Sequence, residues 1–361
     1  MSYSEEQTLF RLAMSSQLGA GLHGSKADVE AGTAQAIETE LGCAREHMGR
    51  WKLVWGPAAF IAGNRPGFPD NMMYVAEGTE TNGNPWLVVS IAGTNPRSLF
   101  DQLFENPPVA PLPWPTSRNP RLRPRVASGA FFGFQILSTL KPGRPQPGAE
   151  SSLTEFLRAK VSKRSNLTVT AHSLGSAVGC LLALWLLEMQ PNWDPYGYAT
   201  IYSYPFAGPS SGDASFSEYY SSSFAMRSTR YYNRLDVVPH AWNADSLLTI
   251  SGLYNPPIDA SALVPLVFLI SLAVRPTGYL QVYPNAKPLP GSSLKRSSAP
   301  TAKSPIVAFI DEQKYQHVGA YFDLLEIGRE AQHLRDTLEG NAPESTVAAT
   351  ELAVRAGDAE E

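Results

Sequence analysis

The order of apolar and polar residues predicts strands that alternate with helices along most of the chain. Two runs rich in β-branched and aromatic residues, 71–78 and 85–94, are separated by turn-forming residues and predict a β-hairpin. Such alternation indicates an α/β fold with a mostly parallel central sheet and helices on both faces. Further strands are predicted at 167–170, 199–208 and 227–234, and helices at 5–20, 26–48, 128–140, 151–163 and 311–338.

The segment 167–189 combines a short strand, a sharp turn and an apolar helix, with Ser173 at the apex of the turn. A nucleophile on such an elbow needs small residues two positions away on either side, because strand and helix nearly touch there. Ala171 and Gly175 meet this demand. The alternative is an ordinary strand-to-helix turn in which the serine only caps the helix.

Two long segments do not fit the alternation and are interpreted as insertions. Residues 95–125 are rich in proline and predict a long surface loop; its apolar side chains favour a cover over an apolar site, and the alternative is a poorly ordered excursion. Residues 257–274 are the most apolar stretch but are too short, and interrupted by Pro265, for a membrane span. They predict either a core helix or an interfacial helix that opens toward lipid.

Composition narrows the classes of function. The chain is 43% hydrophobic and 17% charged with a formal charge of -4, and it lacks the basic stripe that binds nucleic acid. Its two cysteines, Cys43 and Cys180, and its scattered histidines form no metal motif, so we expect no disulfide, metal or cofactor. The first residues lack the features of a secretory signal, which predicts a cytoplasmic or non-classically secreted protein.

A serine nucleophile requires a neutral imidazole as base and an acid that orients it. In α/β-hydrolases the chain order is serine, acid, histidine, so the base must lie downstream of Ser173. Asp236 follows a predicted strand and is the expected acid, with Asp213 as the second choice. His317, at the beginning of a predicted helix, is favoured as the base over His333 in mid-helix.

The remaining residues near the elbow receive supporting roles. His240 is expected to line the site, and His172 is expected to point away from the nucleophile and to support the turn. The backbone amide of Leu174 is expected to stabilise the negative oxygen of the transition state. A second donor is expected at the end of the strand 85–94, at Thr94.

At this point the chain resembles the class 3, or fungal-type, lipase family. LVVSIAGT resembles the family's oxyanion strand, TVTAHSLGSAVGCL its elbow, YSYPFAGPSSGDASF its Phe-Gly-x-Pro turn, YYNRLDVVPHA its acid segment and HVGAYF its terminal His-x-x-Tyr-Phe segment. The resemblance implies a triad of Ser173, Asp236 and His317, an oxyanion hole of Thr94 and Leu174, and a lid within 97–125.

Several positions depart from the family pattern and bear on lid anchoring and substrate preference. Ala171 replaces the first elbow glycine, Ala92 replaces an arginine, Ser176 replaces a glycine, and HVGAYF carries one extra residue.

The sequence therefore predicts an α/β-hydrolase fold with lid and cap insertions. We expect one domain at 1–339, with a helical extension at 1–70, a lid-like loop at 97–125 and a cap insertion at 257–305, followed by a disordered acidic tail at 340–361. The predicted function is a serine ester hydrolase that acts on acyl lipids, with lipid at a membrane or emulsion surface as the partner and no nucleic acid. The alternatives are a phospholipase A-type lipase toxin exported without a signal peptide and a non-catalytic lipid- or protein-binding protein.

Overall fold

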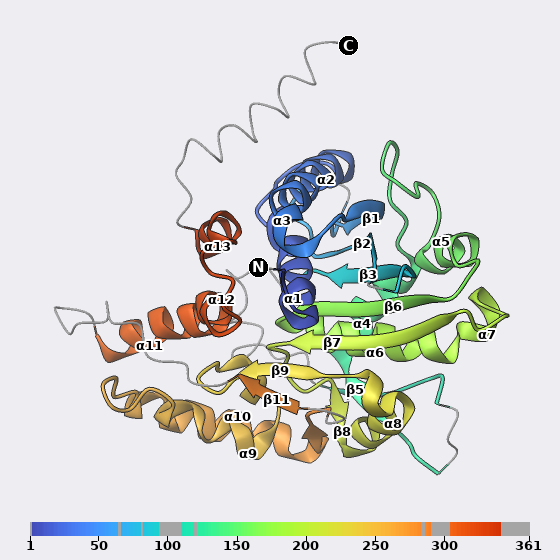
Figure 1. Cartoon of the computed structure of the whole chain (residues 1–361). Coiled ribbons are helices and arrows are strands. Elements are labelled where there is room, and N and C mark those ends of the chain that lie inside the picture. Colours follow the sequence, from blue (N-terminus) through green and yellow to red (C-terminus); the bar gives the residue numbers. More distant parts are fainter. Residues whose placement is uncertain are drawn as a thin grey trace.

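The centre of the molecule is a mixed seven-stranded sheet in the described part of the chain (Figure 1). The computed structural model describes residues 2–63, 66–80, 82–93, 110–117, 121–282, 286–289 and 304–340. The strands, in spatial order, are β1 (Lys52–Phe60), β2 (Asn71–Thr79), β3 (Pro85–Ile91), β6 (Ser165–His172), β7 (Ala199–Phe206), β9 (Arg230–Asn233) and β11 (Ala286–Leu289). β1, β2 and β3 pair antiparallel, and every later pair from β3 to β11 is parallel.

Alternating side chains divide the interior into two cores, one on each face of the sheet. On β2, Met73 and Val75 belong to one buried cluster, while Tyr74 and Ala76 between them belong to the other. β6 is buried along most of its length, as expected for a central parallel strand. Its carboxyl end therefore reaches the edge of the sheet between two covering layers, where ligands bind in open α/β sheets.

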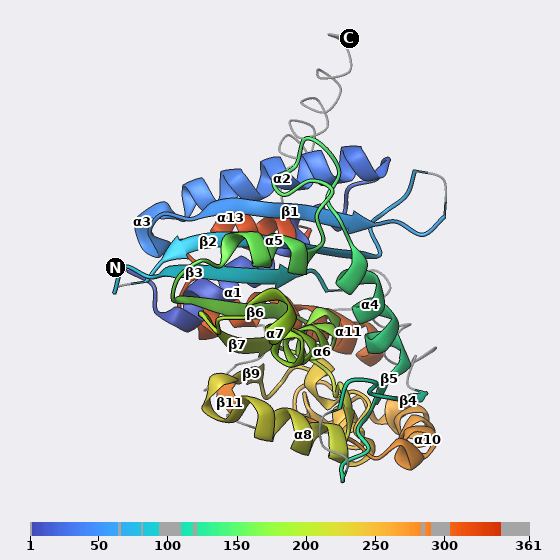
Figure 2. The ribbon, with the colours of Figure 1, turned by 90° about the vertical axis from the view of Figure 1, so that its right-hand side faces the viewer.

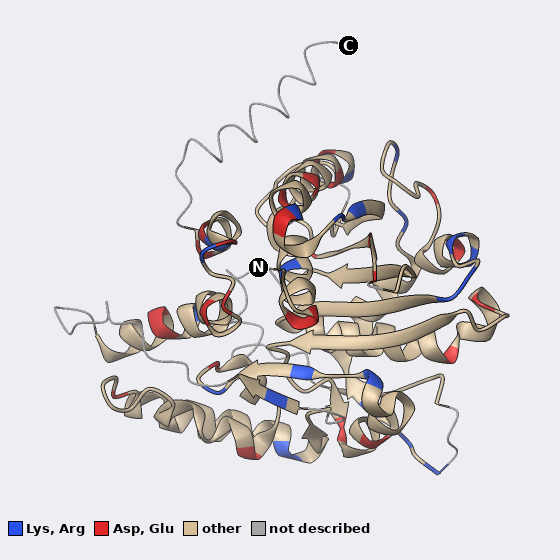
Figure 3. Cartoon of the chain, viewed as in Figure 1, with Lys and Arg blue, Asp and Glu red and all other residues tan. Residues whose placement is uncertain are grey.

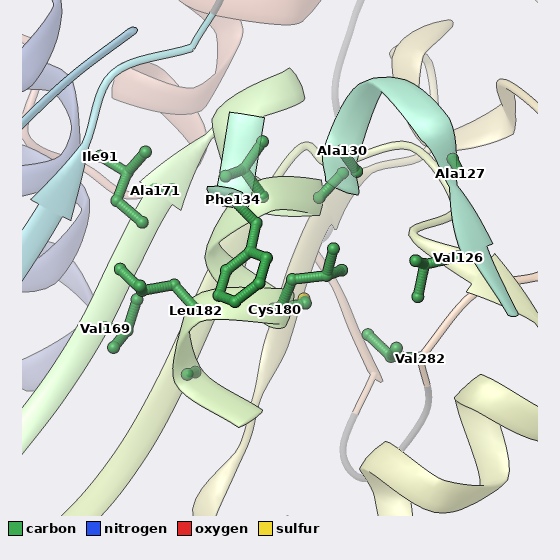
Figure 4. Packing of buried hydrophobic residues seen from close by; sticks show 14 of the residues in the cluster. Ile91, Val126, Ala127, Ala130, Phe134, Val169, Ala171, Cys180, Leu182 and Val282 are labelled. Atoms are coloured by element: carbon green, nitrogen blue, oxygen red, sulfur yellow. The ribbon is translucent and has the colours of Figure 1, made fainter. Parts of the chain in front are cut away.

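Helices cover both faces (Figure 2). One core is built from α4 (Ser128–Thr139), α5 (Leu153–Lys160), α6 (Leu174–Glu188) and α8 (Ala214–Phe224), and the other from α1 (Glu5–Ser15), α2 (Lys26–Cys43), α12 (Ala320–Leu324) and α13 (Gln332–Glu339). Figure 4 shows the first core, where Phe134 of α4 lies beside Cys180 and Leu182 of α6. Because α6 is apolar around most of its circumference, it is buried against sheet and helices alike.

A smaller antiparallel sheet lies beside the main one. Its strands, in order, are β10 (Tyr279–Leu280), β8 (Gly212–Asp213), β5 (Arg125–Ala127) and β4 (Pro111–Pro113). The remaining short helices are α3 (Arg45–Met48), α7 (Gln190–Trp193), α9 (Ala244–Leu247), α10 (Val264–Val274) and α11 (Pro305–Lys314), with single turns η1 (Ser16–Gly19), η3 (Ala225–Arg227), η4 (Val238–His240), η5 (Ile250–Gly252), η6 (Ser261–Leu263), η7 (Arg275–Thr277) and η8 (Tyr315–Gly319).

The alternation of strands and helices predicted from the sequence is confirmed, but three elements differ. β1 lies inside the stretch 1–70 that was expected to be helical, because the Gly56-Pro57 pair obscures its pattern; the strand accommodates this pair with irregular register. β11 lies in what was expected to be a loop. The single helix expected at 311–338 is instead α11, η8 and α12, followed by a break before α13.

The expected insertions are described only in part. Of the lid-like loop 97–125, residues 110–117 and 121–125 are described, and β4 and the first residue of β5 lie there. Of the tail 340–361, all but residue 340 lies outside the described residues. None of the helices in the described part of the chain is long and apolar enough to cross a bilayer.

Candidate active site

The expected serine stands at a sharp turn between β6 and α6. Ser173 has φ 63° and ψ -140°, a strained conformation for a residue with a side chain, and only 4% of its surface is exposed. Its backbone N–H donates to the carbonyl oxygen of Phe206 on the neighbouring strand at 3.0 Å. The strain is thus maintained by the parallel sheet, and the hydroxyl projects from the carboxyl end of the central strand.

The steric demand made on Gly175 is met closely. A Cβ at this position would lie 2.7 Å from the carbonyl oxygen of Ala92 and 3.0 Å from the backbone nitrogen of Gly93. The backbone that follows β3 therefore lies so close to the first turn of α6 that no side chain fits at Gly175. Ser176 strengthens the turn, because its hydroxyl lies 2.8 Å from the carbonyl oxygen of Ala171 and 2.6 Å from that of Phe206.

The fold brings the expected acid and base to this serine. His317 Nε2 lies 2.8 Å from Ser173 Oγ, and His317 Nδ1 lies 2.9 and 3.0 Å from the two carboxylate oxygens of Asp236. The histidine is 144 residues from the serine along the chain and 81 residues from the aspartate. A hydroxyl, an imidazole and a carboxylate in this continuous order are the arrangement that deprotonates a serine.

Asp236 is fully buried, and other donors hold it in addition to the imidazole. The hydroxyl of Tyr321 donates to its Oδ2 at 2.9 Å, and the backbone N–H of Val238 donates to its Oδ1 at 3.0 Å. Burial, and secondarily the charge of Asp236, raise the pKa of Tyr321 well above its usual value. The phenol therefore remains a hydrogen-bond donor to the carboxylate throughout the pH range in which a serine hydrolase works.

His317 lies in a π-helical turn, η8, between α11 and α12. A π turn closes over one more residue than an α turn, and such turns are frequent at functional sites. It directs His317 and Tyr321, four positions apart, toward the same carboxylate. The segment YQHVGAYF contains both His317 and Tyr321, but the sequence analysis did not identify Tyr321 as a hydrogen-bond partner of Asp236.

His172 contacts His317, the residue expected to act as the base. Its Nε2 lies 2.8 Å from the carbonyl oxygen of His317, and the two rings are 4.6 Å apart. Burial lowers the pKa of His172 well below its usual value, and proximity to His317 lowers it further. The ring is therefore neutral near pH 7 and donates its Nε2–H to that carbonyl.

None of the other candidate residues hydrogen-bonds to Ser173, Asp236 or His317 in the described part of the chain, and the lining role of His240 stays a prediction. His240 Nδ1 lies 2.8 Å from Ser246 Oγ, and His333 is located in α13, whereas the only histidine that reaches Ser173 among the described residues is His317. Asp213 caps α8, since its Oδ1 accepts from the backbone of Phe216 at 2.8 Å.

Of the two expected oxyanion donors, Leu174 is described by the structure and Thr94 is not. Leu174 is the first residue of α6, so its N–H belongs to the first turn, where amides lack intrahelical acceptors and face outward. Thr94 lies outside the described residues. In the described part of the chain no group of three histidine, cysteine or acidic residues is suited to hold a metal ion.

A buried carboxylate anchors the described part of the expected lid-like loop 97–125. Trp114, only 4% exposed, directs Nε1 to Glu188 at 3.2 and 3.3 Å, and the hydroxyls of Thr116 and Tyr219 donate to the same carboxylate. The apolar side of Trp114 packs near Phe134. The sequence indicated that Trp114 contacts an apolar region, but Glu188 was not recognised, because nothing local in α6 marks it.

Comparison with known proteins agrees with the fold. A family model of class 3 lipases matches residues 120–246, which include the elbow and the acid segment. The crystal structure of M37 lipase superposes with a TM-score of 0.77 at 26% identity, covering 94% of this chain and 100% of that one. Both matches support membership of the class 3 lipase family. A comparison with curated protein sequences finds no match.

Two other solved lipase structures resemble the chain less closely. A Rhizomucor miehei lipase in complex with its propeptide has a TM-score of 0.42 at 17% identity, covering 66% of this chain and 63% of that one. A lipase from Rhizopus microsporus var. chinensis has a TM-score of 0.42 at 15% identity, with coverages of 66% and 70%.

Family and fold together identify an ester-hydrolysing enzyme with the α/β-hydrolase fold, and they support a lipid ester as its substrate. The expected fold class and enzyme class are thus confirmed. The roles of individual site residues are a separate question, which the geometry around Ser173 addresses.

Proposed function

We propose that this lipase cleaves carboxylic esters of lipids through a covalent acyl-enzyme, with Ser173 as nucleophile, His317 as general base and Asp236 as the orienting acid. One observation carries the proposal: the imidazole of His317 lies within hydrogen-bond distance of both the serine hydroxyl and the buried carboxylate. This geometry fixes the tautomer that the reaction requires, because Nδ1–H donates to Asp236 and leaves the lone pair of Nε2 to accept from Ser173.

In the first half of the reaction Ser173 Oγ forms a bond to the ester carbonyl carbon while its proton passes to His317 Nε2. The carbonyl oxygen becomes negative and accepts from the N–H of Leu174 at the positive end of α6, with Thr94 proposed as the second donor. Collapse of this intermediate breaks the bond to the alcohol, which leaves with the proton from His317. Water then adds to the acyl-enzyme by the same steps and releases the fatty acid.

Substitution of each triad residue tests this proposal. Ser173→Ala or His317→Ala is expected to lower kcat on a p-nitrophenyl ester by about 10⁴-fold or more, and Ser173→Ala is expected to abolish labelling by a fluorophosphonate. Ser217→Ala is the matched control, because this buried serine lies in α8 and donates to the carbonyl oxygen of Gln281 at 2.7 Å, so kcat and labelling are expected to stay unchanged. Labelling of the Ser173→Ala protein equal to that of the wild type would exclude Ser173 as the nucleophile.

The surface of α10 supports action on lipid aggregates rather than on dissolved esters alone. The helix VPLVFLISLAV contains no charged residue (Figure 3) and buries only Val267, Ile270, Ser271 and Val274. Its other large side chains are exposed: Val264 49%, Leu266 42%, Phe268 51%, Leu269 63% and Leu272 48%. Apolar surface of this extent is typical of contact with a membrane or another partner.

We propose that this face of α10 rests on the surface of the lipid substrate. In Figure 1 the helix lies on the side of the molecule toward which β7 and β9 point, and the triad lies at that edge. The helix resembles an interfacial element in that its apolar face is not buried by the rest of the protein. The cap insertion would thus place the carboxyl edge of the sheet against the source of substrate.

The double substitution Phe268→Asp, Leu269→Asp tests this surface. Activity on a long-chain triglyceride or phospholipid emulsion is expected to fall about tenfold or more, because each side chain contributes about 1.5–3 kcal/mol when buried in lipid. The kcat/KM on dissolved p-nitrophenyl acetate is expected to stay unchanged. Met226→Asp is the control, since Met226 is 79% exposed but precedes β9, at the opposite edge. Equal losses on both substrates, or a change from dimer to monomer in solution, would contradict lipid contact.

A further inference from the structure

The N-terminal helix places a glutamine next to the nucleophile. α1 packs along the sheet, where the edge of the Phe10 ring faces His172 and the hydroxyl of Thr170 lies 3.3 Å from the carbonyl oxygen of Leu9. The turn η1 follows α1 directly and carries Gln17, of which 9% is exposed. A segment expected to be only a helical extension is therefore part of the catalytic edge.

The side-chain amide of Gln17 faces the corner formed by Gly93 and the nucleophile. Its Nε2 lies 2.8 Å from the position that a Cβ of Gly93 would occupy, and the Cβ of Ser173 lies 3.2 Å from the same position. The carbonyl oxygen of His172 borders this point at 2.8 Å. Gln17 and Ser173 are thus neighbours across a glycine, at the end of the strand where the oxyanion forms.

The other end of the same amide has no hydrogen-bond partner. Oε1 of Gln17 is buried and unpaired in the part of the chain that the structure describes. A buried polar atom without a partner destabilises a protein, and methionine or leucine would fill similar space without this cost. A polar side chain at this position therefore needs an explanation other than its contribution to folding.

We propose that Gln17 is a further catalytic residue, whose Nε2–H donates to the carbonyl oxygen of the bound ester as that oxygen becomes negative. The proposal rests on the acyl-enzyme mechanism, because it adds a side-chain donor to the backbone donor at Leu174. A donor that already lies in a buried corner beside the nucleophile needs little reorganisation to stabilise the transition state. The N-terminal segment then supplies chemistry, and removing it would impair catalysis.

The variants Gln17→Met and Gln17→Glu test this role. Gln17→Met is expected to lower kcat by about 10²-fold with KM changed less than about threefold, and to weaken an alkylboronic acid inhibitor by the same factor as kcat. Its melting temperature is expected to equal or exceed that of the wild type, because the unpaired oxygen is gone. Gln17→Glu is expected to be slower still at neutral pH, since it places a carboxylate beside the developing oxyanion.

Two controls distinguish a loss of the Gln17 donor from a loss of folding or of the nucleophile. Ser16→Ala removes a buried hydroxyl that donates to the carbonyl oxygen of Ala13 in the same turn, so it is expected to lower stability and leave kcat unchanged. Titration with a fluorophosphonate is expected to give one label per chain in Gln17→Met and none in Ser173→Ala. A Gln17→Met enzyme with kcat within twofold of the wild type, or with a lower melting temperature and unchanged boronate affinity, overturns the role of Gln17 and leaves the triad intact.

Discussion

Tyr321→Phe is the substitution that most directly tests how the acid is held. The phenol of Tyr321 donates to Asp236 Oδ2 at 2.9 Å and accepts from the backbone N–H of Asn233 at 2.9 Å. Phenylalanine retains the ring, which stacks against Phe10, and removes only the oxygen. The change therefore deletes two buried hydrogen bonds and leaves the packing in place.

The structure sets the size of the effect. Asp236 keeps two donors, His317 Nδ1 and the N–H of Val238, so the carboxylate stays in place but is held less firmly. A hydrogen bond to a buried charge contributes about 1.5–3 kcal/mol to the free energy of unfolding, and the unpaired N–H of Asn233 costs about 1–3 kcal/mol more. If about half of the bond to Asp236 acts on the imidazolium in the transition state, about 0.75–1.5 kcal/mol is lost and kcat falls about three- to twelvefold.

Two measurements on each of two variants check this reasoning. The free energy of unfolding comes from urea denaturation, and kcat comes from hydrolysis of a p-nitrophenyl ester. Tyr315→Phe is the matched control, because its hydroxyl donates to Asp323 at the surface at 3.0 Å and not to the site. Tyr315→Phe is expected to leave kcat unchanged. Wild-type kcat in Tyr321→Phe, or an equal loss in both variants, would refute a positioning role for Tyr321.

Three further predictions concern the elbow, the base and the anchored loop. Gly175→Ala places a methyl group 2.7 Å from a backbone oxygen and is expected to lower stability by about 1–3 kcal/mol and kcat at least about tenfold, whereas Gly179→Ala, whose methyl meets its nearest neighbour at 3.5 Å, leaves kcat unchanged. Because the pKa of His172 is lowered in the folded state, the unfolded chain binds a proton below about pH 6.5 that the folded chain does not bind. The free energy of unfolding is therefore expected to fall on acidification below about pH 6.5 by up to about 1.4 kcal/mol per pH unit. His172→Gln should show a smaller fall in urea denaturation from pH 7.5 to 5, and an unchanged slope would assign the pH dependence to other groups. Glu188→Gln weakens the anchor of residues 110–117 by about 1.5–3 kcal/mol and should speed proteolysis there, and cleavage at the wild-type rate would contradict this.

The elbow could be predicted from the sequence because its constraints are local. A strained serine needs small neighbours, and the backbone contact at Gly175 excludes any side chain there. The residues that meet these requirements therefore lie within a few positions of Ser173 in the sequence. The choice of Asp236 and His317 depended on chain order and on the carboxyl ends of parallel strands meeting at one edge. These rules hold for the whole fold, and they were sufficient to select the residues that lie together.

The elements that were missed depend on tertiary context. β1 contains a Gly-Pro pair that argues against a strand, and pairing with β2 overrides this local preference. β11 has only four residues, Ala286–Leu289, and it forms because β9 offers a parallel edge to pair with. The position of Gln17 beside Ser173 results from the packing of α1 on the sheet, and no spacing in the sequence encodes that contact.

The π turn at His317 explains how the site tolerates its main departure from the family pattern. HVGAYF carries one residue more than the family's His-x-x-Tyr-Phe segment, and a continuous α-helix would rotate the later residues by about 100° around the axis as a result. A turn closed by i→i+5 bonds takes up the extra residue, so that Tyr321 and His317 still reach the same carboxylate. Within η8 the backbone thus allows His317 to contact both Ser173 and Asp236, and Tyr321 to contact the same carboxylate, at the spacing present in this chain.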